Sequence, residues 1–456
     1  MKPNDILTLD IQALGEDGDG VSKSGRHTVY VPNAFPGERV TAEVTDVAKT
    51  YAHACMKRVF VASKHRIKPQ CMNVDMCGGC QIQELEYKEQ LRLKHQKVVE
   101  NLRVAGVEVD MEIPMTIGCH DVFHFRNKAI YPVVKNSDGQ IVAGFYARRS
   151  HNIVPSAVCP VGADENVKIV DIIIDHLNRH EIQPYDEATH TGTVRYILIR
   201  KAFHTDSVMV SIVINGQSLP CHNELIERLL AGVKGIKDVS LTVNCDATNR
   251  IRGNEVINLF GDGYITEILG ELKYRISPLA FFQVNTSQAK VLYDKVLEFA
   301  DLKGDETVFD LYCGVGTIAL YLARHCRKVY GVEIIPQAVV DARQNAVLNG
   351  IDNAEFMEGK SEDVASELVG NKGVRADVVV VDPPRKGCDR SLLDTIINMR
   401  PSRLIYVSCD CKTLARDLKI LQDNGFKTKH VQPVDMFPHT VHVESVALLF
   451  PIELPA

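Results

Sequence analysis

The carboxyl-terminal half of the chain alternates apolar runs with segments of helical length. From about Ser277 onward the apolar runs are candidate strands, at 306–311, 328–333, 354–357, 377–382, 403–408, 428–434 and 443–450. Strands that alternate with helices form βαβ units and therefore a largely parallel sheet. The pattern predicts a doubly wound α/β domain over residues 276–456, with ligands bound at the carboxyl ends of its strands.

A glycine turn follows the first of these strands. Residues 310–316 read Asp-Leu-Tyr-Cys-Gly-Val-Gly, and Glu333 ends the next strand. Glycines let the backbone approach a ligand closely, and an acid at the end of the second strand can accept hydrogen bonds from ribose hydroxyls. Ala319 stands where a third glycine would complete the dinucleotide motif, and such sites tolerate alanine there. The turn therefore leaves NAD and S-adenosylmethionine both open.

The loop after the fourth strand favours S-adenosylmethionine. Residues 382–387 read Asp-Pro-Pro-Arg-Lys-Gly, and the prolines stiffen the loop and remove amide donors. An Asp-Pro-Pro loop at this position is typical of nucleic-acid methyltransferases that use S-adenosylmethionine. On that interpretation Glu333 holds the ribose, and Asp382 lies near the methionine end of the cofactor or near the target base.

The next strand ends on a cysteine. Cys409 follows the run Ile-Tyr-Val-Ser at 405–408, and Glu444 lies at an end of the last strand. A thiol at the carboxyl end of a strand lies where open α/β sheets bind their ligands. A carboxylate on a neighbouring strand could act as its general base. The combination indicates covalent catalysis beside a bound cofactor.

The amino-terminal half predicts two further domains. Short alternating strands such as 28–31 and 39–44, punctuated by glycines, predict a small β-barrel over residues 1–60. Residues 61–275 predict a mixed α+β central domain. Its expected elements include a helix over 84–105, a strand over 207–214 and a helix over 222–232.

Basic side chains are concentrated in two segments. The formal net charge is −6, yet residues 47–74 contain no acid and residues 122–163 contain only Asp138. Phosphate contacts require cations, so the segments favour a nucleic-acid face, with ordinary solvated faces as the alternative. The candidate RNA contacts are Phe281, Arg126, Lys128, Arg148 and Arg149.

The composition also limits where the protein works. No apolar run approaches the roughly 20 residues needed to span a membrane, and the first residues lack the apolar core of a signal peptide. We expect a cytoplasmic protein that has no membrane partner and acts as a monomer. Thirteen cysteines in such a chain indicate metal or catalytic roles for some of them rather than a disulfide framework.

Four cysteines form a candidate metal site. Cys71, Cys77 and Cys80 share one loop, with two glycines between the last two, and Cys159 precedes a proline. Zinc usually takes two short cysteine pairs, whereas the glycines and the Cys-Pro step suit an iron–sulfur cluster better. Spacing alone leaves an iron–sulfur cluster, zinc and no metal as alternatives. Cysteines expected only to pack are Cys55, Cys119, Cys221, Cys245, Cys313, Cys326 and Cys388.

Taken together, these motifs resemble the RNA uracil-5-methyltransferase family over nearly the whole chain. They occur in the family's order: a barrel like a TRAM domain, the cysteine loop, Phe-Phe-Gln-Val-Asn at 281–285, the turn at 310–316, the loop at 382–387, Ser-Cys at 408–409, and Glu444. The resemblance implies a Rossmann-like class I S-adenosylmethionine methyltransferase domain. Its implied cofactor residues are Gln283, Tyr312, Gly314, Glu333 and Asp382.

The resemblance also implies roles for the thiols. Cys409 is the implied nucleophile and Glu444 the implied base, while Cys411, two residues further on, is a weaker second candidate for the nucleophile. A [4Fe–4S] cluster is implied on the four upstream cysteines, Cys71, Cys77, Cys80 and Cys159. In the family this cluster serves structure or RNA binding and not methyl transfer.

The chemistry of uracil agrees with this assignment. C5 is too weak a nucleophile to take a methyl group unaided, whereas a thiolate that adds at C6 makes an enolate with its charge at C5. A base must then remove the C5 proton so that the thiolate can leave. The target base must also leave its stack to reach the thiol. Phe281 and Phe282 are candidates for stacking on it, with a place in the core as the alternative.

The resemblance favours 23S rRNA as the substrate and 5-methyluridine as the product. The cysteine cluster and the TRAM-like domain match the rRNA enzymes better than the tRNA enzymes. The alternatives are a tRNA uracil-5-methyltransferase, a non-catalytic RNA-binding assembly factor and an NAD-dependent enzyme. The intact set of Cys409, Glu444, Gln283 and Asp382 disfavours the assembly factor, and the Asp-Pro-Pro loop disfavours the NAD enzyme.

Overall fold

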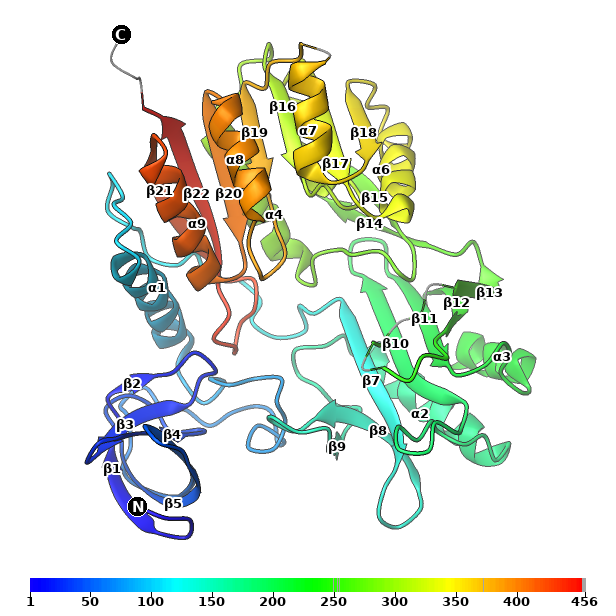
Figure 1. Ribbon diagram of the computed structural model, residues 1–456. Coiled ribbons are helices and arrows are strands. Elements are labelled where there is room, and N and C mark those ends of the chain that lie inside the picture. Colours follow the sequence, from blue (N-terminus) through cyan, green and yellow to red (C-terminus); the bar gives the residue numbers. More distant parts are fainter. Residues whose placement is uncertain (249, 252, 254, 372, 453–456) are drawn as a thin grey trace. The chain divides into compact units, whose positions relative to one another are not determined.

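The computed structural model describes residues 1–248, 250, 251, 253, 255–371 and 373–452 (Figure 1). Its contacts divide the chain into two compact units. The first comprises residues 1–94, 145–154 and 437–442, and the second comprises residues 95–144, 155–436 and 443–456. The predicted division into three domains, 1–60, 61–275 and 276–456, stays a prediction.

The first unit contains a six-stranded sheet in the order β1-β5-β6-β4-β3-β2. Its strands are β1 (Ile6–Asp10), β2 (Ala13–Leu14), β3 (Gly20–Ser24), β4 (His27–Val31), β5 (Arg39–Val47) and β6 (Tyr51–Val61). Apolar residues alternate along these strands, as a one-sided sheet requires, and Val29, Val31, Val40 and Ala42 meet in one buried cluster. This is the small β-barrel that the amino-terminal pattern predicts.

The second unit begins within α1 (Tyr87–Val104). Most of a seven-stranded sheet, in the order β13-β12-β11-β10-β7-β8-β9, belongs to this unit, while residues 145–154 at its β8–β9 end belong to the first. The strands of this sheet are β7 (Lys128–Lys135), β8 (Ile141–Tyr146), β9 (Ile153–Pro155), β10 (Val194–Ala202), β11 (Ser207–Ile214), β12 (Ile236–Val243) and β13 (Glu255–Gly261). The helices α2 (Glu165–Arg179) and α3 (His222–Gly232) belong to the same region, and β14 (Ile265–Leu269) and β15 (Leu272–Ile276) form a hairpin. The mixed α+β character agrees with the expectation.

A second seven-stranded sheet follows, in the order β18-β17-β16-β19-β20-β22-β21. Its strands are β16 (Thr307–Leu311), β17 (Lys328–Glu333), β18 (Ala354–Glu358), β19 (Val378–Val381), β20 (Arg403–Ser408), β21 (Phe426–Val434) and β22 (Glu444–Pro451). The helices are α4 (Thr286–Ala300), α5 (Thr317–Ala323), α6 (Pro336–Leu348), α7 (Ser361–Gly370), α8 (Arg390–Met399) and α9 (Cys411–Asp423). The first five strands in this order are parallel, and β22 runs antiparallel to both neighbours.

This sheet is the predicted doubly wound, Rossmann-like domain. Its central strand β19 is four valines, all buried, because helices cover both faces of a parallel sheet. The antiparallel course of β22 has one consequence for the site. The amino end of β22 lies at the same edge of the sheet as the carboxyl ends of the parallel strands.

Within the described residues, no helix combines the length and the apolar character that crossing a membrane requires.

Candidate active site

Strand register brings the predicted nucleophile and base to one edge of the sheet. Ser408, the last residue of β20, pairs with Ser445 of the antiparallel β22. Cys409 directly follows the first and Glu444 directly precedes the second, so both lie one residue beyond this pair. Cys409 is half-buried and Glu444 is 3% exposed. The predicted pair is therefore positioned by backbone hydrogen bonds of the core sheet.

The glycine turn follows β16 at the same edge. Gly314 and Gly316 have φ of 55° and 84°, and Tyr312 has φ of 109°, a conformation that side chains rarely adopt. The Glu333 carboxylate fixes the turn, since its Oε2 accepts a hydrogen bond from the Gly314 amide at 3.1 Å and its Oε1 accepts one from Ile335 at 2.9 Å. The structure thus gathers the predicted cofactor residues of this segment.

Buried carboxyl groups line this edge. Burial raises the pKa of Asp310 to about 8, and the charge of Asp382 adds to the shift. Burial likewise raises the pKa of Asp382 to about 6. For Glu444, burial and then the Asp382 charge hold the pKa well above its ordinary value.

Three oxygens of Asp310 and Glu444 are buried without a hydrogen-bond partner. The Ala319 amide lies near Asp310, but neither Asp310 oxygen makes a hydrogen bond of normal geometry. Oε2 of Glu444 is also buried without a hydrogen-bond partner. Uncompensated buried acids are costly, and a cation placed among them would be stabilised. S-adenosylmethionine carries a sulfonium and an ammonium group, so the residues present fit this cofactor.

Sequence reasoning missed several residues here. Asp310 is part of the quoted turn but was given no role, although a fully buried acid in a strand is itself unusual. Ile334 and Ile335 directly follow Glu333 and are 59% and 57% exposed. Large exposed apolar side chains beside an acid that is predicted to bind ribose would suit the flat face of an adenine ring. Their position directly after the acid was the available signal.

The Cys409 thiol is held in its neutral form by these surroundings. Burial raises its pKa to about 12, and the negative charges of Glu444 and Asp382 add to the shift. Arg385, an exposed residue of the Asp-Pro-Pro loop, opposes it by lowering the pKa of both Cys409 and Glu444. The charge of Arg385 therefore acts on both the predicted nucleophile and the predicted base, an effect that sequence reasoning missed.

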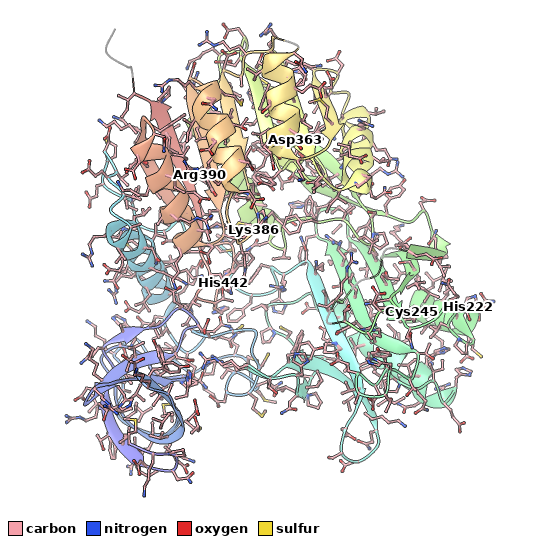
Figure 2. All side chains as sticks on the ribbon, viewed as in Figure 1. His222, Cys245, Asp363, Lys386, Arg390 and His442 are labelled. Carbon is pink, nitrogen blue, oxygen red and sulfur yellow. The ribbon has the colours of Figure 1, made fainter. Side chains whose placement is uncertain are left out.

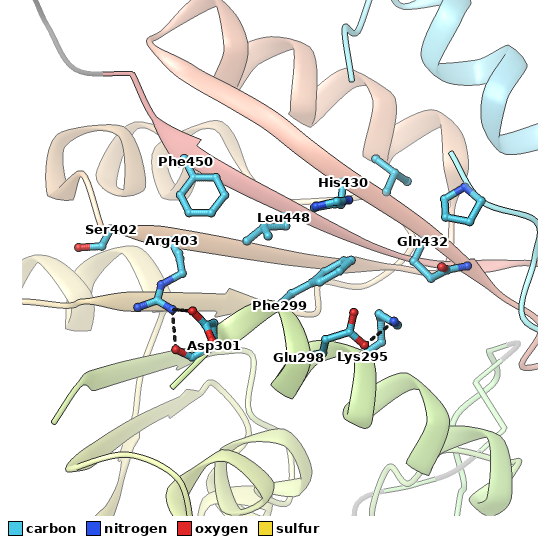
Figure 3. Close-up of a pocket in the computed structure, with 12 residues that line it drawn as sticks. Lys295, Glu298, Phe299, Asp301, Ser402, Arg403, His430, Gln432, Leu448 and Phe450 are labelled. Atoms are coloured by element: carbon cyan, nitrogen blue, oxygen red, sulfur yellow. Dashed lines mark hydrogen bonds and ion pairs between the residues drawn. The ribbon is translucent and has the colours of Figure 1, made fainter. Parts of the chain in front are cut away.

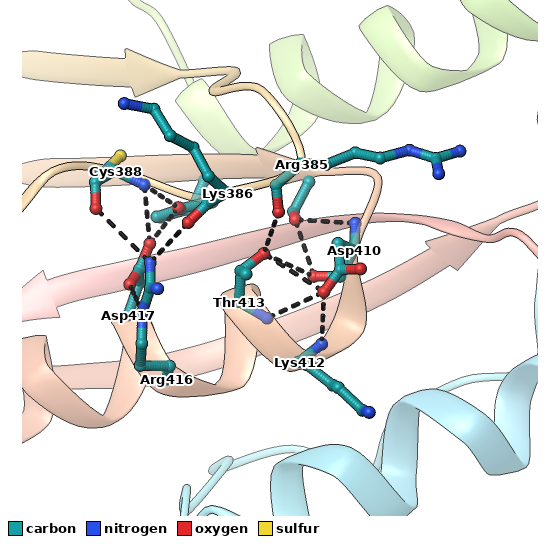
Figure 4. A network of polar contacts seen from close by, with 10 residues as sticks. Arg385, Lys386, Cys388, Asp410, Lys412, Thr413, Arg416 and Asp417 are labelled. Carbon is teal, nitrogen blue, oxygen red and sulfur yellow. Dashed lines mark hydrogen bonds and ion pairs between the residues drawn. The ribbon is translucent and has the colours of Figure 1, made fainter. Parts of the chain in front are cut away.

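Two sets of polar contacts connect the segment from Cys409 into α9 with the Asp-Pro-Pro loop (Figure 4). Asp410 caps α9 by accepting hydrogen bonds from the amides of Lys412 and Thr413, both at 3.0 Å. The Thr413 hydroxyl in turn donates to the backbone oxygen of Arg385 at 3.1 Å. The position of Arg385 thus depends on the first turn of the helix that follows Cys409.

A fully buried carboxylate makes the second tie. Asp417 of α9 accepts hydrogen bonds from the Tyr406 hydroxyl at 2.5 Å and from the Cys388 amide at 2.9 Å. Arg416 donates to the other Asp417 oxygen at 2.7 Å and to the backbone oxygen of Lys386 at 2.9 Å. One carboxylate therefore joins a strand, a helix and the loop that carries Asp382.

A cavity of about 680 Å³ lies away from these groups (Figure 3). Arg403 begins β20 and lines the cavity, whereas Cys409 follows the opposite end of that strand. The cavity also contains the stacked rings of Phe299 and His430, whose centroids are 5.5 Å apart. It is not the predicted catalytic centre.

Other predicted site residues have mixed placements. Gln283 is buried just before Asn285, which caps α4 by accepting a hydrogen bond from the Gln288 amide at 3.1 Å. Phe282 is 1% exposed and packs in the core beside Tyr274, whereas Phe281 is 62% exposed. Only Phe281 of the phenylalanine pair can therefore stack on a base. Cys411 is 6% exposed as the first residue of α9, which disfavours it as the nucleophile.

The predicted RNA contacts are not equally available. Arg126 and Lys128 are half-buried, and Nε of Arg126 donates to the Lys128 backbone oxygen at 3.1 Å. Arg149 is exposed but forms ion pairs with Asp19 and Asp17. Arg148 contacts the cysteine loop, because its Nη2 donates a hydrogen bond to the Cys80 backbone oxygen at 3.0 Å. Their contact with RNA stays a prediction.

The cysteine loop belongs to the first unit, where strand-like pairing joins Cys77 to Ala147. Cys159, the fourth predicted ligand, belongs to the second unit.

The expectation for the other cysteines was partly wrong. Cys119, Cys313, Cys326 and Cys388 are buried as expected. Cysteines predicted to pack but exposed are Cys55, Cys221 and Cys245. Cys55 lies on the exposed face of β6, Cys221 directly precedes α3, and Cys245 follows β12 by two residues. Residue type alone does not distinguish these positions from core positions.

Comparison with known proteins connects this geometry to a family. A family model described as tRNA (Uracil-5-)-methyltransferase matches residues 218–451, and a TRAM domain model matches residues 2–57. An uncharacterized RNA methyltransferase of Halalkalibacterium halodurans is 44% identical over 446 residues, covering 98% of this chain and 97% of the relative. Another, of Clostridium tetani, is 43% identical over 450 residues with the same coverage.

One solved structure matches nearly the whole chain. It is the Pyrococcus abyssi tRNA (uracil-54, C5)-methyltransferase in complex with S-adenosyl-L-homocysteine. The TM-score is 0.80 at 29% identity, and the match covers 97% of this chain and 99% of that one.

The tie between the loops predicts a stability effect. Replacing Asp417 with alanine leaves the buried Cys388 amide and Tyr406 hydroxyl without their acceptor, which should lower the free energy of unfolding by about 2–4 kcal/mol. Urea unfolding measures the change. Asp394→Ala is the matched control, because its partner Arg390 is a surface residue labelled in Figure 2, and such a pair contributes about 0–1 kcal/mol. Equal losses in both variants would contradict the assignment.

The pKa of Cys409 predicts its reactivity with iodoacetamide. The thiolate is the reacting form, so at about pH 7.5 cofactor-free protein should alkylate Cys409 at least about 10-fold more slowly than exposed Cys245. The Cys409 rate should rise with pH toward the raised pKa. Arg385→Gln should slow the reaction further, because it removes a positive charge that lowers the pKa of Cys409. Peptide mass spectrometry follows both cysteines, and equal rates in the native protein would refute the shift.

Proposed function

Because the chain belongs to the tRNA (uracil-5-)-methyltransferase family, we propose that Cys409 and Glu444 catalyse its reaction through a covalent adduct with uracil. The family membership makes the protein an S-adenosylmethionine-dependent RNA uracil-5-methyltransferase with a TRAM domain. The observation that carries the proposal is the Ser408–Ser445 pairing, which puts a thiol and a carboxylate side by side at the edge where the cofactor turn lies.

Cys409 begins the reaction. Its thiol loses its proton to solvent and its sulfur bonds to C6, while the C5–C6 π electrons move toward O4 and give an enolate. When bound, S-adenosylmethionine would supply an electrophilic methyl group for C5, with S-adenosylhomocysteine as the leaving group. Arg385 favours the thiolate because its positive charge lowers the pKa of Cys409. The surrounding acids alone would disfavour it, so the thiol is activated only when positive charge enters the site.

Glu444 completes the cycle. Its carboxylate takes the proton from C5, the electrons of that C–H bond re-form the C5–C6 double bond, and the C6–S bond breaks to release the Cys409 thiolate. Burial and the neighbouring Asp382 raise the pKa of Glu444. A carboxylate with a raised pKa is a stronger base than an ordinary one, which suits removal of a proton from carbon.

We propose 23S rRNA as the RNA substrate, on the resemblance to the large-subunit rRNA enzymes. A tRNA is the second candidate, and a specific observation favours it. The solved structure of a tRNA enzyme matches 97% of this chain, so the whole architecture also occurs in an enzyme that acts on tRNA. Mapping 5-methyluridine in both RNAs from a deletion strain distinguishes them, since only the true substrate loses the mark.

A [4Fe–4S] cluster on Cys71, Cys77, Cys80 and Cys159 belongs to the same proposal. Two features of the first unit fit such a group. The backbone amide of Gly79 donates a hydrogen bond to the Cys77 sulfur at 3.4 Å, and the side-chain amide of Gln83 donates one to the Cys80 sulfur at 3.8 Å. Such hydrogen bonds are common around cluster thiolates.

The second feature is the guanidinium of Arg148. Its Nε and Nη1 are buried without hydrogen-bond partners, next to a loop whose thiolates would be anionic once they ligate iron. Bound in this loop, the cluster would join the cysteine segment to the 145–154 segment and would be balanced by Arg148.

The covalent mechanism predicts different results for its two residues. Cys409→Ala should lower turnover by at least about 10³-fold, because no nucleophile remains. Glu444→Gln should lower turnover by about 10²–10⁴-fold and let a protein–RNA adduct accumulate, because the C5 proton stays in place. Denaturing gel electrophoresis with labelled RNA measures the adduct. The control is Asp363→Asn, because Asp363 is an exposed acid on α7, labelled in Figure 2. Near-normal turnover of Cys409→Ala would refute the mechanism.

The cluster predicts a spectrum. Protein purified without oxygen should absorb at about 400 nm and contain iron and sulfide, and Cys77→Ser should lose both. Exposed Cys245 provides the control substitution Cys245→Ser, which should keep them. Native protein that lacks this absorption, or that holds zinc instead, would contradict the cluster.

A further inference from the structure

Two histidines and a glutamate meet between α2 and α3, far along the chain from the methyltransferase residues. The two helices lie against each other in the second unit (Figure 1). His176 lies in the last turn of α2, and His180 follows the helix directly. The two are four residues apart and therefore lie on the same side of the helix end. Glu224 comes from the first turn of α3. One ligand atom from each of the three lies within 4.8 Å of the others.

His176 has a buried nitrogen without a partner. The side chain is completely buried, and its Nε2 lies 3.2 Å from the backbone oxygen of Pro220. A carbonyl oxygen only accepts, so Nε2 carries the hydrogen and Nδ1 of the neutral ring carries a lone pair. Nδ1 is buried and has no hydrogen-bond partner. An unsatisfied buried acceptor is costly unless something occupies it.

This arrangement is the usual one for a metal-ligating histidine. Such histidines donate their second ring N–H to a backbone carbonyl or a carboxylate, which fixes the ring and leaves the other nitrogen for the metal.

His180 and Glu224 supply the other two ligand atoms. Nε2 of His180 lies 2.9 Å from Oε2 of Glu224, and both side chains are partly exposed. An isolated surface pair of this kind contributes about 0–1 kcal/mol and would leave Nδ1 of His176 unexplained. Ligands of a tetrahedral Zn²⁺ lie about 3.3 Å apart, given bonds of about 2.0–2.1 Å. The three groups need to close by roughly 1.5 Å at most.

Side chains at helix ends can move by this amount more easily than side chains in the middle of a helix. His180 directly follows α2, and Glu224 is the third residue of α3. Arg228 is the nearby cation that opposes a metal ion. Its charge is countered by Asp175, which forms ion pairs with both Arg228 and Arg179.

We propose that His176, His180 and Glu224 bind one divalent transition-metal ion, of the Zn²⁺ class, that clips the end of α2 to the beginning of α3. Imidazole ligands select Zn²⁺, Ni²⁺ or Co²⁺ over Mg²⁺ and Ca²⁺, which prefer oxygen. Three protein ligands leave the fourth position to water. The site is separate from methyl transfer and from the cysteine loop.

Titration of the full-length protein with Co²⁺ tests the proposal. Co²⁺ held by nitrogen and oxygen gives a visible spectrum without the intense thiolate charge-transfer band of cysteine-bound Co²⁺, so the thirteen cysteines do not obscure the result. Native protein should bind one equivalent of Co²⁺ with this spectrum, and it should unfold at a higher temperature when Co²⁺ is bound. His180→Gln and Glu224→Gln should each weaken binding at least about 10-fold.

Both substitutions fall at partly exposed positions, so the folded protein should persist. His222→Gln is the matched control, because His222 lies on α3 two residues from Glu224 (Figure 2) and its Nδ1 already bonds the Leu219 backbone oxygen at 3.1 Å. It should bind Co²⁺ like the native protein. The proposal is wrong if native protein binds no Co²⁺ through nitrogen and oxygen ligands. It is also wrong if His180→Gln and Glu224→Gln both bind Co²⁺ as tightly as native protein.

Discussion

Uncompensated negative charge at one edge of the methyltransferase sheet is the constraint on which the site depends. Asp310, Asp382 and Glu444 lie near the ends of β16 and β19 and the beginning of β22. Burial raises the pKa of all three, and the charge of Asp382 adds to the shifts of Asp310 and Glu444. A fold tolerates this cost only where it serves a ligand. A methyl donor with a sulfonium and an ammonium group would supply the missing charge. On the proposed mechanism these acids favour binding of the cofactor and keep the Cys409 thiol neutral until positive charge arrives.

Two structural devices hold these groups in place. The antiparallel β22 returns to the same edge as the parallel strands, which lets a residue at a strand's beginning face a residue at a strand's end. Asp417 and Thr413 then tie the Asp-Pro-Pro loop to α9, so Arg385 and Cys409 keep a fixed relation. Pre-arranged charges of this kind act in a site without reorganisation during the reaction.

The sequence predicted the fold of this half of the chain closely, for a physical reason. Runs such as Val378–Val381 are buried on both faces and are flanked by turn residues, so their strands were predicted within about two residues of the observed ends. The positions of Cys409 and Glu444 at strand ends were predicted correctly because they are local features, while their catalytic roles stay a proposal. The roles of Arg385 and Asp310 could not be predicted, since each depends on charges brought together by tertiary structure. The same holds for His176 and Glu224, which are 48 positions apart by their numbers.

The central claim is that the Cys409 sulfur bonds to C6 while Glu444 removes the C5 proton. RNA that carries 5-fluorouridine tests it most directly, because a base cannot remove fluorine from C5 as it removes a proton. Incubation with S-adenosylmethionine, digestion and mass spectrometry should find one peptide, containing Cys409, linked to a methylated fluorouridine. A link to Cys411 or to another cysteine, or methylation without any covalent link, would contradict the account.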